Sequence, residues 1–148
     1  MKNRDFTTSI SVDRTPEEVF AAINDVRGWW SGEIEGDADQ LGAEFTYRYK
    51  DMHRSRQKVT ESIRGKKIVW HVFESRLGFI ENKSEWTGTD IVFEISGKEG
   101  KTEVRFTHVG LVPQCECFDD CSNGWSSLVG GNLRKLITTR TRQPDAFA

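Results

Sequence analysis

Three cysteines lie close together in the C-terminal part of the sequence, where their spacing could serve metal or thiol chemistry. Cys115 and Cys117 are separated by one residue, Cys121 follows, and His108 lies upstream. Zinc sites usually combine two Cys-x-x-Cys pairs, or a cysteine pair with a histidine pair, and this segment has neither. Cys117 and Cys121 are one helical turn apart, where free cysteine packs as a small apolar side chain. We therefore expect packing residues and no metal site, with a low-pKa thiol at Cys115 or Cys117 as the alternative.

The carboxylates and histidines show no catalytic spacing. Asp119 and Asp120 are adjacent, but consecutive helical residues point about 100° apart, so we expect two solvated side chains and no shared proton. His53, His71 and His108 have no Ser, Cys or Asp at a distance along the chain that is typical of a triad. We expect ordinary strand histidines, and the alternative is a catalytic site whose members converge from separate segments.

Tryptophan is frequent for a chain of 148 residues, and its five positions are Trp29, Trp30, Trp70, Trp86 and Trp125. A buried indole still needs a partner for its N–H. Small-molecule pockets combine aromatic walls with a few polar groups in this way. We therefore expect at least two of Trp29, Trp30, Trp70 and Trp125 to line a pocket.

Hydrophobic periodicity predicts the elements that must position these residues. A strand is followed by a helix with a capping box at Thr15–Glu18, and a short helix follows at once. Alternating apolar residues then predict several strands, and a long helix follows Pro113. The short helix is predicted over Val26–Trp30. The predicted strands are Phe6–Val12, Phe45–Tyr49, Val59–Ile63, Ile68–Phe73, Ile91–Ile95 and Val104–His108. This order predicts an α+β domain in which a curved antiparallel sheet of six or seven strands wraps around the last helix.

The last helix carries one apolar stripe, formed by Cys117, Cys121, Trp125, Leu128, Val129, Leu133 and Leu136. Asn123–Gly124 is the expected point of a bend, and Gly130–Gly131 predicts close approach to the sheet. Asn132 falls within the stripe in projection. A buried amide without partners costs about 1–3 kcal/mol. Asn132 is therefore expected either to bond an internal group, such as Glu61 or a tyrosine hydroxyl, or to face a cavity.

Composition narrows the functional classes. We expect one domain over residues 1–148, because no repeat or linker interrupts the chain. The net charge of −2 with interspersed signs argues against nucleic acid as a partner. The sequence contains no run of 18 apolar residues, so no membrane span is predicted. The N-terminal residues lack the apolar core of a signal peptide, so a cytoplasmic location is expected.

Several segments, in their order and spacing, resemble the family related to the C-terminal domain of the activator of the heat-shock-protein-90 ATPase. The segments are Thr15–Phe20 followed by Trp29–Trp30, Gly42–Phe45, Val59–Glu61, Lys67–Trp70, Thr107–Pro113 and Gly124–Leu128. The resemblance covers roughly residues 5–142. It implies the helix-grip fold of START-like and birch-pollen-allergen-like proteins. It also implies a choice among three roles: binding apolar ligands, serving as a co-chaperone domain, or having no assigned role.

The predicted function is binding of a small apolar or amphipathic molecule, without a cofactor, in a cavity between the sheet and the last helix. The predicted site residues are Trp29, Trp30, Phe45, Tyr47, Trp70, Trp125, Leu128 and Asn132. One alternative is an interaction domain that binds a chaperone or a second copy as a homodimer, although the chain is expected to lack the extra N-terminal region of co-chaperones. The other is a hydrolase, cyclase or isomerase that uses the same cavity.

Overall fold

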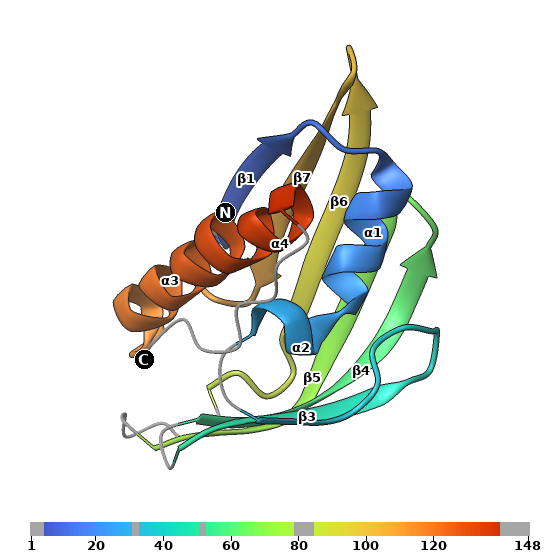
Figure 1. Ribbon diagram of the computed structural model, residues 1–148. Coiled ribbons are helices and arrows are strands. Elements are labelled where there is room, and N and C mark those ends of the chain that lie inside the picture. Colours follow the sequence, from blue (N-terminus) through green and yellow to red (C-terminus); the bar gives the residue numbers. More distant parts are fainter. Residues whose placement is uncertain (1–4, 31–32, 51–52, 79–84, 140–148) are drawn as a thin grey trace.

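The computed structural model describes residues 5–30, 33–50, 53–78 and 85–139 (Figure 1). Seven strands in these ranges form one antiparallel sheet in the order β1-β7-β6-β5-β4-β3-β2. The strands are β1 (Phe6–Val12), β2 (Glu33–Gly36), β3 (Glu44–Tyr49), β4 (His53–Ile63), β5 (Lys67–Leu77), β6 (Asp90–Lys98) and β7 (Lys101–Val109). The helices are α1 (Pro16–Asn24), α2 (Val26–Trp29), α3 (Phe118–Ser127), the π-helical segment η1 (Leu128–Leu133) and α4 (Arg134–Thr139).

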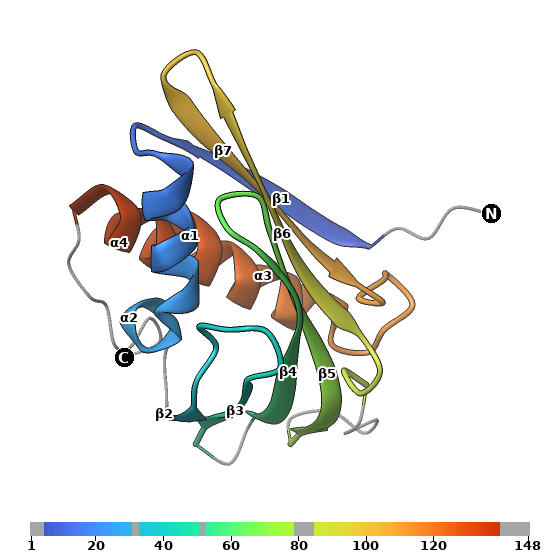
Figure 2. The ribbon, with the colours of Figure 1, turned by 90° about the vertical axis from the view of Figure 1, so that its right-hand side faces the viewer.

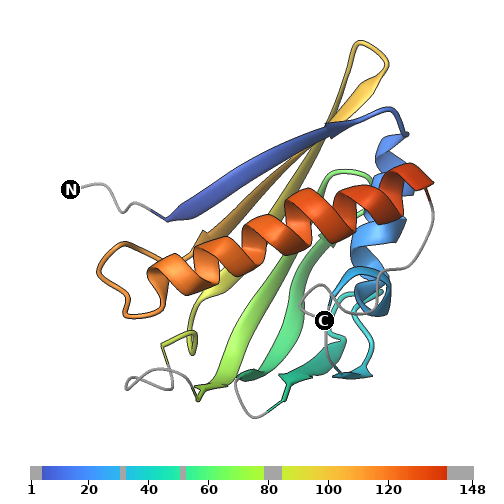
Figure 3. The ribbon, with the colours of Figure 1, turned by 60° about the vertical axis from the view of Figure 1, so that its left-hand side comes forward.

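The helices cover one face of the sheet, and α3, η1 and α4 form one continuous rod that crosses the strands (Figures 2 and 3). The strands bury alternate residues, as β7 shows most regularly. The β4–β5 pairing shifts register between Arg56 and Gln57 and again between Val59 and Glu61. Such irregularities bend a strand and increase its twist, which lets the sheet curve around the rod. The predicted α+β helix-grip architecture is confirmed.

The start of α1 agrees with the sequence in detail. The Thr15 side chain accepts a hydrogen bond from the Glu18 backbone N–H, and the Glu18 carboxylate accepts one from the Thr15 N–H, both at 3.1 Å. Pro16 occupies the first turn, where its missing N–H costs nothing. The predicted capping box is therefore confirmed, and α2 ends at Trp29, one residue earlier than predicted.

The C-terminal rod differs from the prediction at its glycines. α3 runs without a break through Asn123 and Gly124, and the irregular turn lies in η1. Gly130 and Gly131 in η1 are exposed, and a Cβ on either would meet nothing within 4 Å. The expected bend and the expected close approach were both wrong. A π turn holds more residues than an α turn, so the buried stripe continues through Leu133 while Asn132 moves to its flank.

Aromatic rings fill the core beneath α2. Trp29 stacks on Trp70 with ring centroids 6.3 Å apart, and its indole N–H donates to the Ile23 carbonyl. Phe93 contacts Trp29 and Trp70 edge to face. Edge-to-face and stacked pairs contribute beyond the area that they bury. This ring cluster fixes α2 against the sheet, and Trp30 follows directly from the end of that helix.

Candidate functional site

A cavity of about 570 Å³ lies between the rod and the strands β3 and β4. Its aromatic side, which we call the ring wall, consists of Trp30, Tyr47, Tyr49, His53, Trp86 and Trp125. Its other side, which we call the helix wall, consists of Asp120, Cys121, Asn123, Gly124, Ser127 and Leu128. The volume falls within the range of pockets for small organic ligands.

Strand alternation and hairpin register place half of the ring wall. Tyr47 and Tyr49 are two residues apart on β3, so both point to the concave face. His53, the first residue of β4, pairs directly with Tyr49 in the antiparallel register. Trp30 meets Tyr47 at a centroid distance of 4.4 Å and Trp125 at 5.3 Å. The end of α2, strand β3 and helix α3 therefore meet at one aromatic corner.

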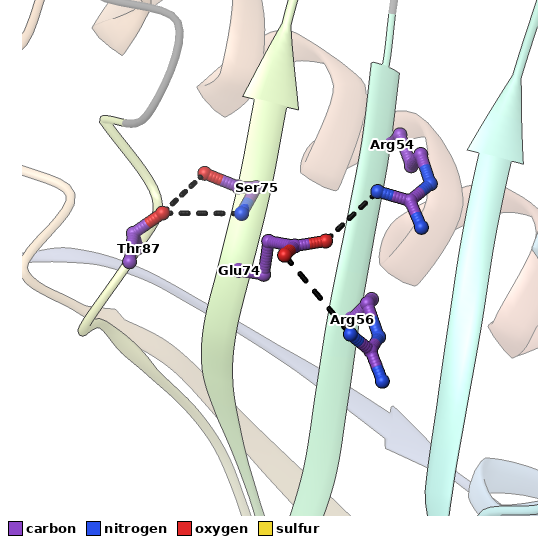
Figure 4. A network of polar contacts seen from close by, with 5 residues as sticks. All are labelled: Arg54, Arg56, Glu74, Ser75 and Thr87. Carbon is purple, nitrogen blue, oxygen red and sulfur yellow. Dashed lines mark hydrogen bonds and ion pairs between the residues drawn. The ribbon is translucent and has the colours of Figure 1, made fainter.

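Trp86 reaches the cavity from the segment between β5 and β6. Its ring stacks on Trp125 with an interplanar angle of 8° and a centroid distance of 5.7 Å. It also lies between two imidazoles, 4.5 Å from His53 and 4.6 Å from His108. The neighbouring Thr87 hydroxyl accepts a hydrogen bond from the Ser75 N–H and contacts the Ser75 hydroxyl, both at 3.1 Å (Figure 4). This anchor ties the Trp86 segment to β5.

A chain of hydrogen bonds fixes the tautomer of His108. The indole N–H of Trp125 can only donate, and it donates to Nδ1 of His108 over 3.0 Å. The proton of the neutral ring is therefore on Nε2, which donates to the Thr89 hydroxyl over 2.8 Å. That hydroxyl donates in turn to the Trp86 carbonyl over 2.6 Å. The chain joins α3, β7 and the Trp86 segment, and it holds both stacked tryptophans in place.

Both histidines near the cavity are neutral at pH 7. Burial lowers the pKa of His53 to about 3. Burial also lowers the pKa of His108 to about 3, and the nearby His53 adds to this effect. Nε2 of His53 lies 3.2 Å from the Ser55 hydroxyl, to which the Gln57 amide donates over 3.0 Å. His71, by contrast, lies away from the cavity and contacts Asp90 at 2.8 Å.

The His53–Ser55 pair does not resemble an activated nucleophile. Ser55 is 1% exposed and lies outside the two walls of the cavity. Within the described ranges, no carboxylate accepts a hydrogen bond from the His53 or His108 ring to orient it as a base. Nucleophilic catalysis requires both an accessible nucleophile and an oriented base. The geometry therefore favours His53 and Ser55 as neutral polar groups beside the ring wall rather than as catalytic residues.

The pKa values of the cysteine thiols are shifted in the opposite direction from the low-pKa alternative. Burial raises the pKa of the Cys115 thiol. The pKa of the Cys117 thiol is raised by its hydrogen bond with Cys121 and by burial. The Glu85 carboxylate accepts hydrogen bonds from the N–H groups of Glu116 and Cys117, at 2.7 and 2.9 Å, just before α3. A carboxylate at that position takes the donors that would stabilise a thiolate. These raised pKa values contradict the alternative of a low-pKa thiol at Cys115 or Cys117. No group of three or more potential metal ligands occurs in the described ranges.

The structure divides the predicted site residues into two groups. Trp30, Tyr47, Trp125 and Leu128 line the cavity. Trp29, Phe45 and Trp70 belong to the core behind it. The Asn132 amide donates to the Trp29 carbonyl over 3.0 Å, so it bonds an internal group. The π turn in η1 accounts for this displacement from the stripe.

Some lining residues were missed by the sequence reasoning, although patterns for several were present. Tyr49 continues the period of Tyr47, and the polar residues of the helix wall flank the predicted apolar stripe at helical spacing. Those polar residues are Asp120, Asn123 and Ser127. Trp86 had no such signal, because its position depends on contacts with residues distant in sequence.

Two indoles of the ring wall have hydrogen-bonding capacity that the described residues do not use. The indole nitrogens of Trp30 and Trp86 are buried, and no acceptor lies within reach of either among those residues. An unpaired buried donor costs about 1–3 kcal/mol.

The curved sheet, the C-terminal rod and the cavity between them define a START-like protein of the helix-grip class. The chain belongs to the family of activator of Hsp90 ATPase homolog 1-like proteins, whose model matches residues 13–138. The resemblance seen in the sequence is thereby confirmed. No curated protein matches the chain.

Solved structures share the fold. The Aha1 dimer from Colwellia psychrerythraea has a TM-score of 0.71 and 24% identity over 90% of this chain and 95% of that chain. Protein MLL2253 from Mesorhizobium loti has a TM-score of 0.70 and 15% identity over 93% and 99%. DynU16, from the dynemicin biosynthetic locus, has a TM-score of 0.68 and 15% identity, and this chain spans 49% of its length. At these identities the similarity shows the fold alone.

Proposed function

We propose that the protein binds a small apolar or amphipathic molecule in the cavity between the ring wall and the helix wall. The observation that carries this proposal is a cavity of about 570 Å³ with six rings on one side. Aromatic and apolar walls with a few polar groups are the usual composition of such pockets. Asp120, Asn123 and Ser127, all exposed, supply polar groups along the helix wall.

The two alternatives have less support. An enzyme needs a reactive group at the cavity, and the imidazole that lines it, His53, is neutral and without an orienting carboxylate in the described ranges. A partner-binding domain would favour a continuous apolar surface. The large exposed apolar residues described are Leu41, Ile63 and Val109, which lie on three separate segments. None of the helices in the described ranges is long and apolar enough to cross a membrane.

Three further expectations stay predictions. Chaperone binding and self-association as a homodimer are two of them. The Aha1 protein of Colwellia psychrerythraea was solved as a dimer, which supports a test of self-association by analytical ultracentrifugation. A cytoplasmic location is the third.

A pair of glycines on the rod offers a matched test of the cavity. Gly124 belongs to the helix wall, whereas Gly130 is exposed, outside the cavity and surrounded by open space. We expect Gly124→Leu to fill the cavity and to reduce binding of the uncharged dye N-phenyl-1-naphthylamine about tenfold or more. Gly130→Leu should leave the dye affinity unchanged. Replacing a helical glycine by leucine favours the helix by roughly 0.5–1 kcal/mol, and the unfolding curves show whether each variant is folded.

Dye fluorescence titrations and urea unfolding curves on both variants provide the measurement. Equal dye affinity in the wild type and in Gly124→Leu, with both folded, would contradict the proposed site. Loss of binding in both variants would place the dye elsewhere on the rod.

A further inference from the structure

The described residues that line the cavity carry a single formal charge. Among the described residues of the two walls, Asp120 is the only one that is charged at pH 7, because burial keeps His53 neutral. Neither lysine nor arginine belongs to that lining. An anionic head group would therefore find no cation within the walls, and burying an unpaired charge is costly.

Strand alternation places the arginines of this region on the other face of the sheet. Arg54 and Arg56 alternate with the buried Ser55 and Gln57 on β4, so they point away from the cavity. There they meet Glu74, at 2.8 Å and 4.0 Å (Figure 4). The sheet therefore separates these cations from any ligand in the cavity.

Aromatic faces attract cations, because the π electrons make the face of the ring negative. Five of the six rings in the ring wall belong to Trp or Tyr, and these bind ammonium groups best. One example already exists at the edge of the wall, where Nζ of Lys50 lies 5.2 Å from the centre of the Tyr49 ring. Lys50 itself is exposed and outside the lining.

We propose that the cavity selects an amphipathic organic cation, with an apolar body among the rings and an ammonium head beside Asp120. The proposal rests on the function proposed above and specifies its ligand class. The positive N-terminal end of α3 does not reverse the preference for a cation. The carboxylate of Glu85 already accepts hydrogen bonds from the N–H groups that precede the helix. Asp119 and Asp120 add two further negative charges in the first turn.

Three ligands with one chain and different heads test the charge preference. They are decyltrimethylammonium, 1-decanol and decanoate, each below its solubility or micelle limit, measured by displacement of N-phenyl-1-naphthylamine and by calorimetry. We expect the cation to bind about tenfold more tightly than the alcohol, and the carboxylate to bind more weakly than the alcohol. The preference should shrink as salt is raised, because salt screens exposed charges.

Two neighbouring carboxylates provide a matched pair of variants. Asp120→Asn should weaken binding of the cation about three- to tenfold and leave binding of the alcohol unchanged. Asp119→Asn removes the same charge from the same helical turn but outside the lining, and it should change cation binding less than twofold. Equal losses in both variants would reduce the effect to general surface charge and overturn the selection at Asp120.

The outcomes separate the two proposals. Decanoate that binds as tightly as the cation, or Asp120→Asn without effect on the cation, overturns the charge selection while decanol binding keeps the cavity as a ligand site. If none of the three ligands binds, the proposed function itself fails.

Discussion

The two faces of strands β3, β4 and β5 come from alternating residues of the same segments, yet they carry opposite chemistry. The concave face presents uncharged groups, among them Tyr47, Tyr49, His53 and Trp70. The convex face presents Arg48, Arg54 and Arg76, which pair with one another in register across three strands. A period of two is sufficient to separate charged from aromatic side chains, and here it places no lysine or arginine in the described lining of the cavity.

The convex face has an energetic consequence. Like charges directly opposite on neighbouring strands are unfavourable. Glu74 offsets this cost, because its carboxylate contacts Arg54 and Arg56 at once (Figure 4). These side chains are about half exposed, so solvent weakens each ion pair. The concave face, by contrast, carries buried aromatic side chains, among them Tyr47 and Trp70. We therefore expect changes there to have much larger effects.

The largest difference is expected between Trp125 and Arg54. Trp125 is 2% exposed, stacks on Trp86 and donates to His108. Trp125→Ala should reduce the free energy of unfolding by about 3–5 kcal/mol. Arg54→Ala should reduce it by less than about 1 kcal/mol. Urea unfolding of both variants measures the contrast, and a loss below about 1 kcal/mol in Trp125→Ala would show that this face of the helix is misplaced.

A second effect concerns pH. The pKa of His53 and of His108 is about 3 in the folded protein and about 6.5 in the unfolded chain. Between these values the unfolded chain binds protons that the folded protein excludes, so stability falls as the pH drops below about 6.5. Each histidine should cost about 2 kcal/mol between pH 7 and pH 5.

The variant His108→Gln isolates one half of that effect. Unfolding in urea at pH 7 and pH 5 gives the loss of stability over this interval for the wild type and for the variant. We expect the loss to be smaller in His108→Gln by about 2 kcal/mol. The same loss in both proteins would show that His108 does not exclude a proton in the folded state.

The smallest effect is expected on the convex face at Glu74. Glu74→Gln removes the carboxylate that separates Arg54 from Arg56, and it should cost less than about 1 kcal/mol at low ionic strength. Because salt screens exposed charges, the cost should disappear near 1 M sodium chloride. Thermal melts at both salt concentrations measure it, and a cost that persists at high salt would indicate packing by Glu74.

The sequence determined those features of this protein that depend on neighbours along the chain. The capping box at Thr15, the strand Phe6–Val12 and the buried stripe from Cys117 to Leu136 all follow from short periods and local hydrogen bonds. The order of these elements was enough to predict the helix-grip architecture, because an apolar helix face and a half-apolar sheet must cover each other.

The tertiary structure alone decided which segments line the cavity. Trp86 lines it because Thr87 bonds Ser75 and its own ring stacks on Trp125, contacts between residues far apart in the sequence. Glu85 occupies the start of α3 for the same reason. Asn132 lies outside the predicted site and bonds the Trp29 carbonyl, because the π-helical turn of η1 is wider than an α-helical turn. Local patterns specify which residues share a face, whereas the neighbours of that face depend on how distant segments pack.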